Sequence, residues 1–149
     1  MSTRSTIAVK TDEGKFLAVY CHWDGYPTHN GVILNEKYNT TDKVAKLVAG
    51  GDMSSLADSG KSGKLKNPVY YADRGEAWSD VEPVFFDTAQ QWTDYYSDSW
   101  CEYYYLWNGK EWLISKGNQA EGEYPEFNLA EVAIQQYIDV EKQMEEDFG

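Results

Sequence analysis

The stretch CEYYYLWNGKEWLISK, residues 101–116, decides the fold more than any other part of the chain. Aromatic and β-branched residues dominate both of its ends, and such residues favour β-strands. Between the two ends stands Asn108-Gly109, the residue pair preferred in a two-residue type I′ turn, because both central positions of that turn need a positive φ. Residues 101–107 and 110–116 are therefore predicted to form an antiparallel hairpin.

A second hairpin is predicted at the N-terminus. Residues 6–10 and 15–23 are rich in β-branched and aromatic side chains, and the polar stretch TDEG separates them, with Gly14 near the turn. Residues 68–72 and 84–86 have the composition of further short strands.

Short helices are predicted between these strands. The first covers residues 31–38, with Asn30 or Thr28 as its N-cap, and the second follows an N-cap at Asp42. A third is predicted over residues 87–96.

The C-terminus is predicted to form a longer helix. Asn128 is a suitable N-cap, and Glu131 stands three residues later, at the spacing of a capping box. Apolar residues then recur at helical spacing as far as Phe148, while Asp and Glu occupy the other face. Residues 54–67 are rich in Ser, Gly and Lys and show no period, so a loop is expected there.

These elements predict a single α+β domain spanning residues 1–149. Its sheet is mainly antiparallel, built from the N-terminal hairpin and the C-terminal Asn-Gly hairpin, and packed against the short helices and the longer C-terminal helix. The longest apolar run, residues 16–21, is too short for a signal-peptide core or a membrane span. Two cysteines do not make a disulfide framework for 149 residues, so a cytoplasmic protein with reduced thiols is expected.

Charge is distributed unevenly along the chain, whose formal net charge is −12. Residues 1–66 hold nine Lys/Arg and seven Asp/Glu, a net of +2, whereas residues 67–149 hold four Lys/Arg and eighteen Asp/Glu, a net of −14. An acidic surface repels the phosphates of nucleic acids and attracts basic proteins. Direct nucleic-acid binding by the second half is therefore not expected.

Three stretches carry a resemblance to a known group of proteins: STRSTIAV at residues 2–9, YCHWDGY at 20–26 with HNG at 29–31, and GDMSSL at 51–56. They are spread over about the first third of the chain, which resembles a family of small bacteriophage-encoded proteins without a settled biochemical function. The resemblance implies an accessory protein expressed inside a bacterial host cell. It brings no catalytic residues to transfer.

The second strand and the loop after it hold both histidines of the chain and several groups that suit a small ligand. Rings for stacking stand beside hydrogen-bonding groups, as in a nucleotide pocket. The candidate ligand-binding residues are Arg4, His22, Trp23, Asp24, Tyr26, His29 and Asn30. The structural interpretation of the same loop is a buried Cys21, a core Trp23 and a polar turn held by Asp24, Asn30 and Gly31.

Tryptophan and tyrosine alternate with acidic residues between positions 70 and 112. Aromatic anchors surrounded by carboxylates are typical of a surface that docks on a basic protein. The candidate partner-binding residues are Trp92, Asp94, Tyr95, Asp98, Trp100, Glu102 and Tyr104. Since alternate residues of a strand face opposite sides, either helices cover both faces of the sheet or an aromatic face is exposed.

The leading hypothesis is a non-enzymatic phage protein that docks on and inhibits a basic host protein, such as a nucleic-acid-handling or defence factor. The alternative is a protein that sequesters a nucleotide or another small ligand with Arg4 and residues 22–30. A hydrolase using Cys21 or a metal is a third hypothesis, but no usual ligand spacing is present. No cofactor, metal or membrane contact is expected, and the sequence is also compatible with a homodimer.

Overall fold

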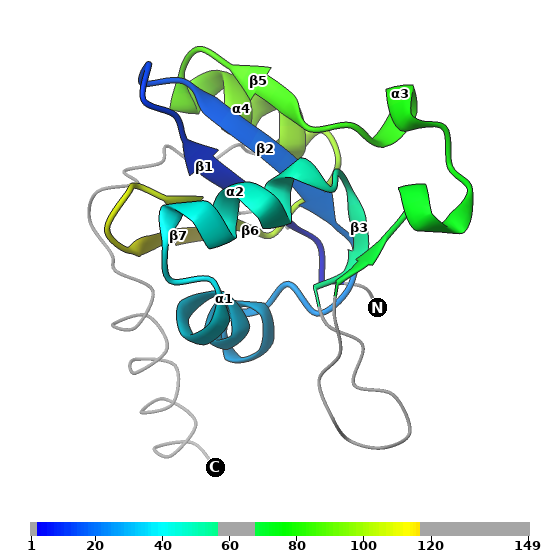
Figure 1. Ribbon diagram of the computed structural model, residues 1–149, viewed down its shortest axis with the longest axis horizontal. Coiled ribbons are helices and arrows are strands. Elements are labelled where there is room, and N and C mark those ends of the chain that lie inside the picture. Colours follow the sequence, from blue (N-terminus) through cyan, green and yellow to red (C-terminus); the bar gives the residue numbers. More distant parts are fainter. Residues whose placement is uncertain (1–2, 57–67, 117–149) are drawn as a thin grey trace.

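A computed structural model describes residues 3–56 and 68–116, whose strands form one seven-stranded sheet (Figure 1). The strands are β1 Ser5–Lys10, β2 Phe16–Cys21, β3 Met53–Ser55, β4 Val69–Tyr70, β5 Val84–Phe86, β6 Tyr103–Trp107 and β7 Trp112–Lys116. The helices are η1 Pro27–Gly31, α1 Val32–Lys37, α2 Thr41–Ala49, η2 Ala72–Arg74, α3 Trp78–Val81 and α4 Ala89–Ser97. The predicted α+β class is confirmed. The expected helix after Asn128 lies outside the described residues, as does most of the expected loop over residues 54–67.

The sheet has the strand order β4-β3-β2-β1-β6-β7, and β5 pairs with β2 beside this path. Four of its pairings are antiparallel, as expected, including the hairpins β1–β2 and β6–β7. The pairings β1–β6 and β2–β3 are parallel. The two predicted hairpins therefore meet side by side, with the N-terminal strand β1 in the centre of the sheet.

The turn of the N-terminal hairpin follows the prediction. Gly14 has a φ of +77°, and its N–H donates to the carbonyl oxygen of Thr11 at 2.9 Å. The N–H of Thr11 in turn donates to the carbonyl oxygen of Lys15 at 2.8 Å. A left-handed residue closes this turn, which explains the glycine.

The C-terminal hairpin forms where it was predicted, but its turn is not type I′. Trp107 pairs with Trp112, and only Gly109 has a positive φ, of 103°. The side-chain oxygen of Asn108 accepts the N–H groups of Lys110 and Glu111, both at 2.9 Å. Asn108 therefore stabilises the turn through its side chain, whose oxygen accepts backbone N–H groups. The turn does not need Asn108 in the left-handed conformation.

The helices begin close to the predicted positions, with different caps. No side chain caps α1, which follows the π-helical turn η1 directly. The side chain of Thr40, not Asp42, caps α2 by accepting the N–H of Lys43. Thr88 and Gln91 form a capping box at the start of α4.

Helices cover both faces of the sheet, and each face has its own core. Ile7 and Val9 point to the core beneath α1 and α2, while Ala8 points to the core beneath α4. In Figure 1, α2 crosses one side of the sheet and α4 lies behind it. The covered-sheet alternative is therefore correct for β6, whose five residues are all buried. No helix in the described ranges is long and apolar enough to cross a membrane.

Candidate functional site

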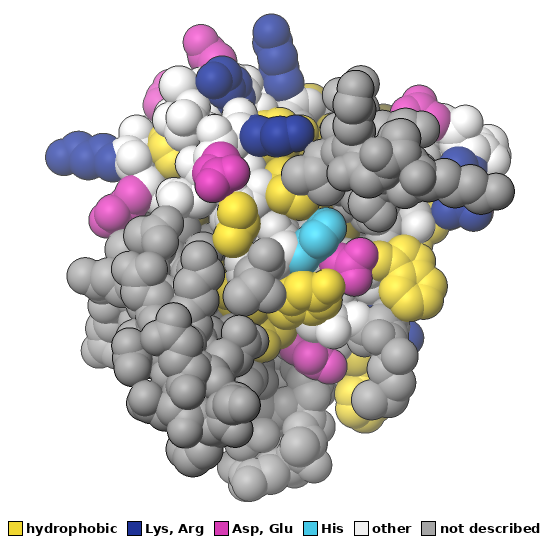
Figure 2. All heavy atoms as spheres, turned by 90° about the horizontal axis from the view of Figure 1, so that it is seen from below, with side chains coloured by type: hydrophobic (Ala, Val, Ile, Leu, Met, Phe, Trp, Pro, Cys, Tyr) yellow, Lys and Arg dark blue, Asp and Glu magenta, His cyan; other side chains and the backbone are white. Residues whose placement is uncertain are grey.

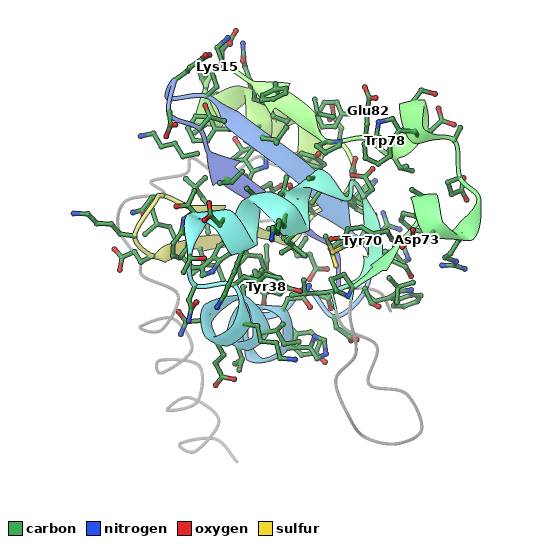
Figure 3. All side chains as sticks on the ribbon, in the orientation of Figure 1. Lys15, Tyr38, Tyr70, Asp73, Trp78 and Glu82 are labelled. Atoms are coloured by element: carbon green, nitrogen blue, oxygen red, sulfur yellow. The ribbon has the colours of Figure 1, made fainter. Side chains whose placement is uncertain are left out.

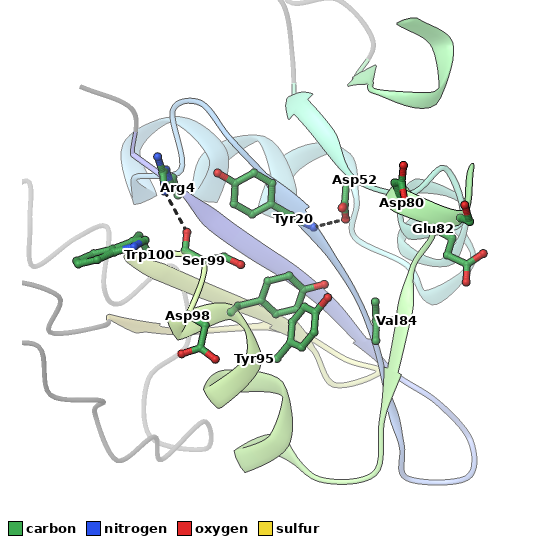
Figure 4. Close-up of a pocket in the computed structure, with 12 residues that line it drawn as sticks. Arg4, Tyr20, Asp52, Asp80, Glu82, Val84, Tyr95, Asp98, Ser99 and Trp100 are labelled. Carbon is green, nitrogen blue, oxygen red and sulfur yellow. Dashed lines mark hydrogen bonds between the residues drawn. The ribbon is translucent and has the colours of Figure 1, made fainter. Parts of the chain in front are cut away.

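A cleft of about 520 Å³ opens between the α3 segment and the C-terminal end of α4 (Figure 4). We call it the α3/α4 cleft. Its lining comes from segments that are far apart in the sequence: Arg4, Tyr20, Asp52, Ser79, Asp80, Glu82, Val84, Tyr95, Tyr96, Asp98, Ser99 and Trp100. Figure 4 shows Asp80 and Glu82 at one end, Arg4 and Trp100 at the other, and Tyr20 and Asp52 between them.

Asp52 fills a gap in the edge of β2. Strand β5 pairs with residues 16–18 of β2, and β3 pairs with Cys21, so Tyr20 lies between the two partner strands. The N–H of Tyr20 donates to Oδ1 of Asp52 at 2.9 Å. The carboxylate thus takes the place of a missing strand at this position, since a backbone donor at a sheet edge needs an acceptor.

The backbone of Asp52 joins the surrounding segments. Its N–H donates to the carbonyl oxygen of Val81 at 2.7 Å, and its carbonyl oxygen accepts the N–H of Tyr71 at 3.1 Å. Burial raises the pKa of the Asp52 carboxyl to about 6, although the hydrogen bond from Tyr20 opposes this shift. A nearby cation would stabilise the ionised form of such a carboxylate.

The carboxylates of the cleft outnumber its cations. Asp80, Glu82 and Asp98 are exposed, and Asp52 is half-buried, while Arg4 is the one basic residue among the lining residues that the structure describes. Acidic and basic side chains are interspersed on the face of the molecule in Figure 2. The cleft is therefore a local concentration of negative charge, suited to a cationic group.

Arg4 braces the end of the cleft at which Trp100 lies. Its Nη1 donates to the carbonyl oxygen of Ser99 at 3.3 Å, and its own carbonyl oxygen accepts the N–H of Glu102 at 2.8 Å. These bonds tie β1 to the connection between α4 and β6. Burial and the charge of Arg4 lower the pKa of His22, whose Nδ1 lies 2.8 Å from the hydroxyl oxygen of Tyr20.

Two large rings are exposed at the α4 side of the cleft. Tyr95 is 51% exposed and Trp100 is 61% exposed. Tyr96, by contrast, is buried against Phe86. Aromatic residues are enriched in protein–protein interfaces, and the carboxylates beside these two rings add attraction for a cation.

The predicted ligand-binding set is divided by the structure. Arg4 lines the cleft, whereas His22, Trp23, Asp24, Tyr26, His29 and Asn30 do not. Asn30 is fully buried and donates to Ser5 Oγ and Cys21 Sγ, both at 3.5 Å, so its assignment as a ligand group is wrong. Its oxygen lies 2.9 Å from His29 Nδ1. The structural interpretation is correct for Cys21 but wrong for Trp23, which is 46% exposed.

The predicted partner-binding set is also divided. Tyr95, Asp98 and Trp100 line the cleft, Asp94 is exposed on α4, and Glu102 is half-buried.

The assignment of Trp92 and Tyr104 to a surface is wrong, because both are fully buried between α4 and the sheet. Their polar atoms are satisfied internally: Trp92 Nε1 donates to Thr6 Oγ1 at 3.0 Å, and the Tyr104 hydroxyl lies 2.9 Å from Ser97 Oγ.

Sequence reasoning did not assign Tyr20, Asp52, Asp80 or Glu82 to a site. These residues come from three separate segments, of which only one holds two of them, and they share no local motif. The one signal was the acidic-aromatic run that includes Trp78-Ser79-Asp80, which resembles the run around Tyr95 and Asp98. Tyr20 and Asp52 come to the cleft only through tertiary contacts, which no local sequence pattern reveals.

Both cysteines are buried. Cys21 is fully buried, and burial raises the pKa of its thiol to about 12. Its Sγ donates to the carbonyl oxygen of Trp23 at 3.7 Å. Burial also raises the pKa of the Cys101 thiol. Over residues 3–56 and 68–116, no group of three or more His, Cys, Asp or Glu side chains could hold a metal ion.

Comparison of the chain with protein-family models, curated proteins and solved structures finds no match. The chemistry of the α3/α4 cleft is therefore what indicates a function.

Proposed function

We propose that the protein acts by binding: its α3/α4 cleft docks on a basic segment of a partner protein and blocks that segment. The observation that carries this proposal is a cleft lined by four carboxylates and two exposed rings, with a single arginine at one end. The partner's cation lies at the end formed by Asp80 and Glu82, away from Arg4.

Long-range attraction supports the same assignment. Residues 67–149 carry a net charge of −14, so a basic surface is drawn toward this part of the chain before contact. Nucleic-acid-handling proteins present basic surfaces to phosphate backbones. Together with the resemblance to phage proteins, this favours a host nucleic-acid-handling or defence protein as the partner.

A nucleotide is a poorer fit for the cleft. Its phosphates would face the carboxylates of Asp52, Asp80 and Glu82, and like charges repel. Arg4 is the one lining residue that attracts phosphate, and its Nη1 already donates to Ser99.

The test uses a short labelled peptide of alternating arginine and glycine, with binding followed by fluorescence anisotropy. The double variant Asp80→Asn/Glu82→Gln removes two exposed charges at the acidic end. We expect the affinity to fall by about three- to tenfold, and to fall also with added salt.

The matched control is Asp12→Asn/Glu13→Gln in the β1–β2 turn, which removes the same number of charges outside the cleft. Lys15 of this turn lies well away from Glu82 (Figure 3). Equal losses in the two double variants would mean that net charge alone acts, and no binding by the wild type would reject the proposal.

A further inference from the structure

Trp100 adopts a backbone conformation that a tryptophan rarely takes. Its φ is +64°, in the left-handed region, where a bulky side chain is strained. Yet the side chain is 61% exposed, so core packing does not hold it there.

The turn itself requires the left-handed residue. The N–H of Cys101 donates to the carbonyl oxygen of Tyr96 at 3.1 Å, and the N–H of Trp100 donates to that of Ser97 at 3.0 Å. These two bonds form the Schellman motif that ends α4 and leads the chain back to β6. Trp100 occupies the position where helices ending in this way usually have glycine.

Folding alone therefore gives no reason for a tryptophan at position 100. Glycine would form the same turn without strain. Residues held in strained backbone conformations cluster at active sites, ligand clamps and switch regions. This ring lies at the rim of the α3/α4 cleft.

We infer that Trp100 is the anchor residue of the interface, and that it contacts an apolar side chain next to the basic residue of the partner's segment. This inference rests on the proposed function. Arg4 braces the Ser99 carbonyl beside Trp100, so a second cation is repelled at this end. The recognised segment thus combines a basic residue, placed near Asp80 and Glu82, with a neighbouring apolar residue placed on the indole.

The experiment compares two labelled peptides of equal charge. One alternates arginine and glycine, and in the other phenylalanine replaces every second glycine. We expect the phenylalanine peptide to bind the wild type about tenfold more tightly, as for an aromatic anchor. Trp100→Gly is expected to abolish this gain, so that the variant binds the two peptides with equal affinity.

Thermal unfolding separates an anchor from a structural residue. Trp100→Gly relieves the left-handed strain, so its Tm is expected to rise by about 2–4 °C. The control Trp23→Gly removes another exposed indole, outside the cleft and at an ordinary φ, and should lower the Tm while keeping the phenylalanine gain.

Two results would overturn the inference: a fall in the Tm of Trp100→Gly, or equal binding of both peptides by the wild type. If the arginine–glycine peptide still depends on Asp80 and Glu82, the proposed function survives either result. If neither peptide binds, the proposed function fails as well.

Discussion

Asp52 links the sheet to the cleft through three hydrogen bonds. Its side chain accepts the N–H of Tyr20, and its backbone binds Val81 and Tyr71. The position therefore needs an acceptor atom, whereas the negative charge is costly in a half-buried place.

Replacing Asp52 with asparagine separates these two effects. The folded state raises the pKa of the carboxyl from 3.8 to about 6, so folding disfavours ionisation. The contribution of Asp52 to stability should thus be most favourable below about pH 4 and become less favourable as the pH rises through 6. Asp52→Asn keeps an acceptor without the charge, and at pH 7.5 it should be more stable by on the order of 1 kcal/mol.

Urea unfolding at pH 4 and pH 7.5 checks this expectation. Near pH 4 the variant and the wild type should differ little. Asp12→Asn, at an exposed position in the β1–β2 turn, serves as the control and should show no such pH-dependent gain. A variant that is less stable than the wild type at pH 7.5 but not at pH 4 would mean that the charge itself stabilises the fold.

Helix α4 forms one wall of the cleft and covers one core, so its start matters to both. Thr88 Oγ1 accepts the N–H of Gln91 at 3.2 Å, and Gln91 Oε1 accepts the N–H of Asp87 at 3.0 Å. Removing the hydroxyl leaves a helix N–H group without its acceptor.

Thr88→Ala is therefore expected to lower the free energy of unfolding by about 1 kcal/mol. Thr88→Ser keeps the hydroxyl and should retain most of the wild-type stability. Chemical denaturation measures both values. An equal loss in the two variants would show that the methyl group of Thr88, and not its hydroxyl, supports the helix.

Local patterns predicted the elements better than their exact ends. Both hairpins follow from strand composition and turn residues, which act over a few positions. The cap of α2 was misplaced because Thr40, Thr41 and Asp42 are all good capping residues, and only the packing of Val44 and Leu47 fixes the start. The Asn-Gly turn was misjudged because the asparagine side chain offered the backbone another bond.

At the scale of the molecule, the sequence could not say which rings face the solvent. Trp92 follows Gln91 and Trp100 follows Ser99, yet Trp92 is fully buried and Trp100 is 61% exposed. The difference arises because Trp92 lies on the face of α4 that packs on the sheet, whereas Trp100 lies in the turn after α4. The sequence also could not show the cleft, since Arg4 and Tyr20 meet only when β1 pairs with β2, and Asp52 reaches Tyr20 only when β2 pairs with β3.

The two cysteines report on the two cores. Cys21 lies in the core beneath α1 and α2, and Cys101 lies in the core beneath α4. Both cores share one sheet, so we expect them to open together in a single cooperative transition. In mild denaturant, an aromatic disulfide reagent should label the one thiol that remains in each of the variants Cys21→Ala and Cys101→Ala. The two labelling rates should be equal once they are corrected for the difference between the variants' free energies of unfolding. Much faster labelling of Cys101 would show that the α4 layer opens alone.

The parallel pairing of β1 with β6 has a consequence for how the protein is made. Thr6 and Tyr104 lie side by side in the sheet, although almost a hundred positions separate them along the chain. During synthesis the first hairpin leaves the ribosome long before its central strand finds this neighbour, and such non-local contacts slow folding. Until β6 emerges, the apolar edge of β1 has no neighbouring strand. We therefore expect nascent fragments of this protein to be bound by chaperones and cut by proteases.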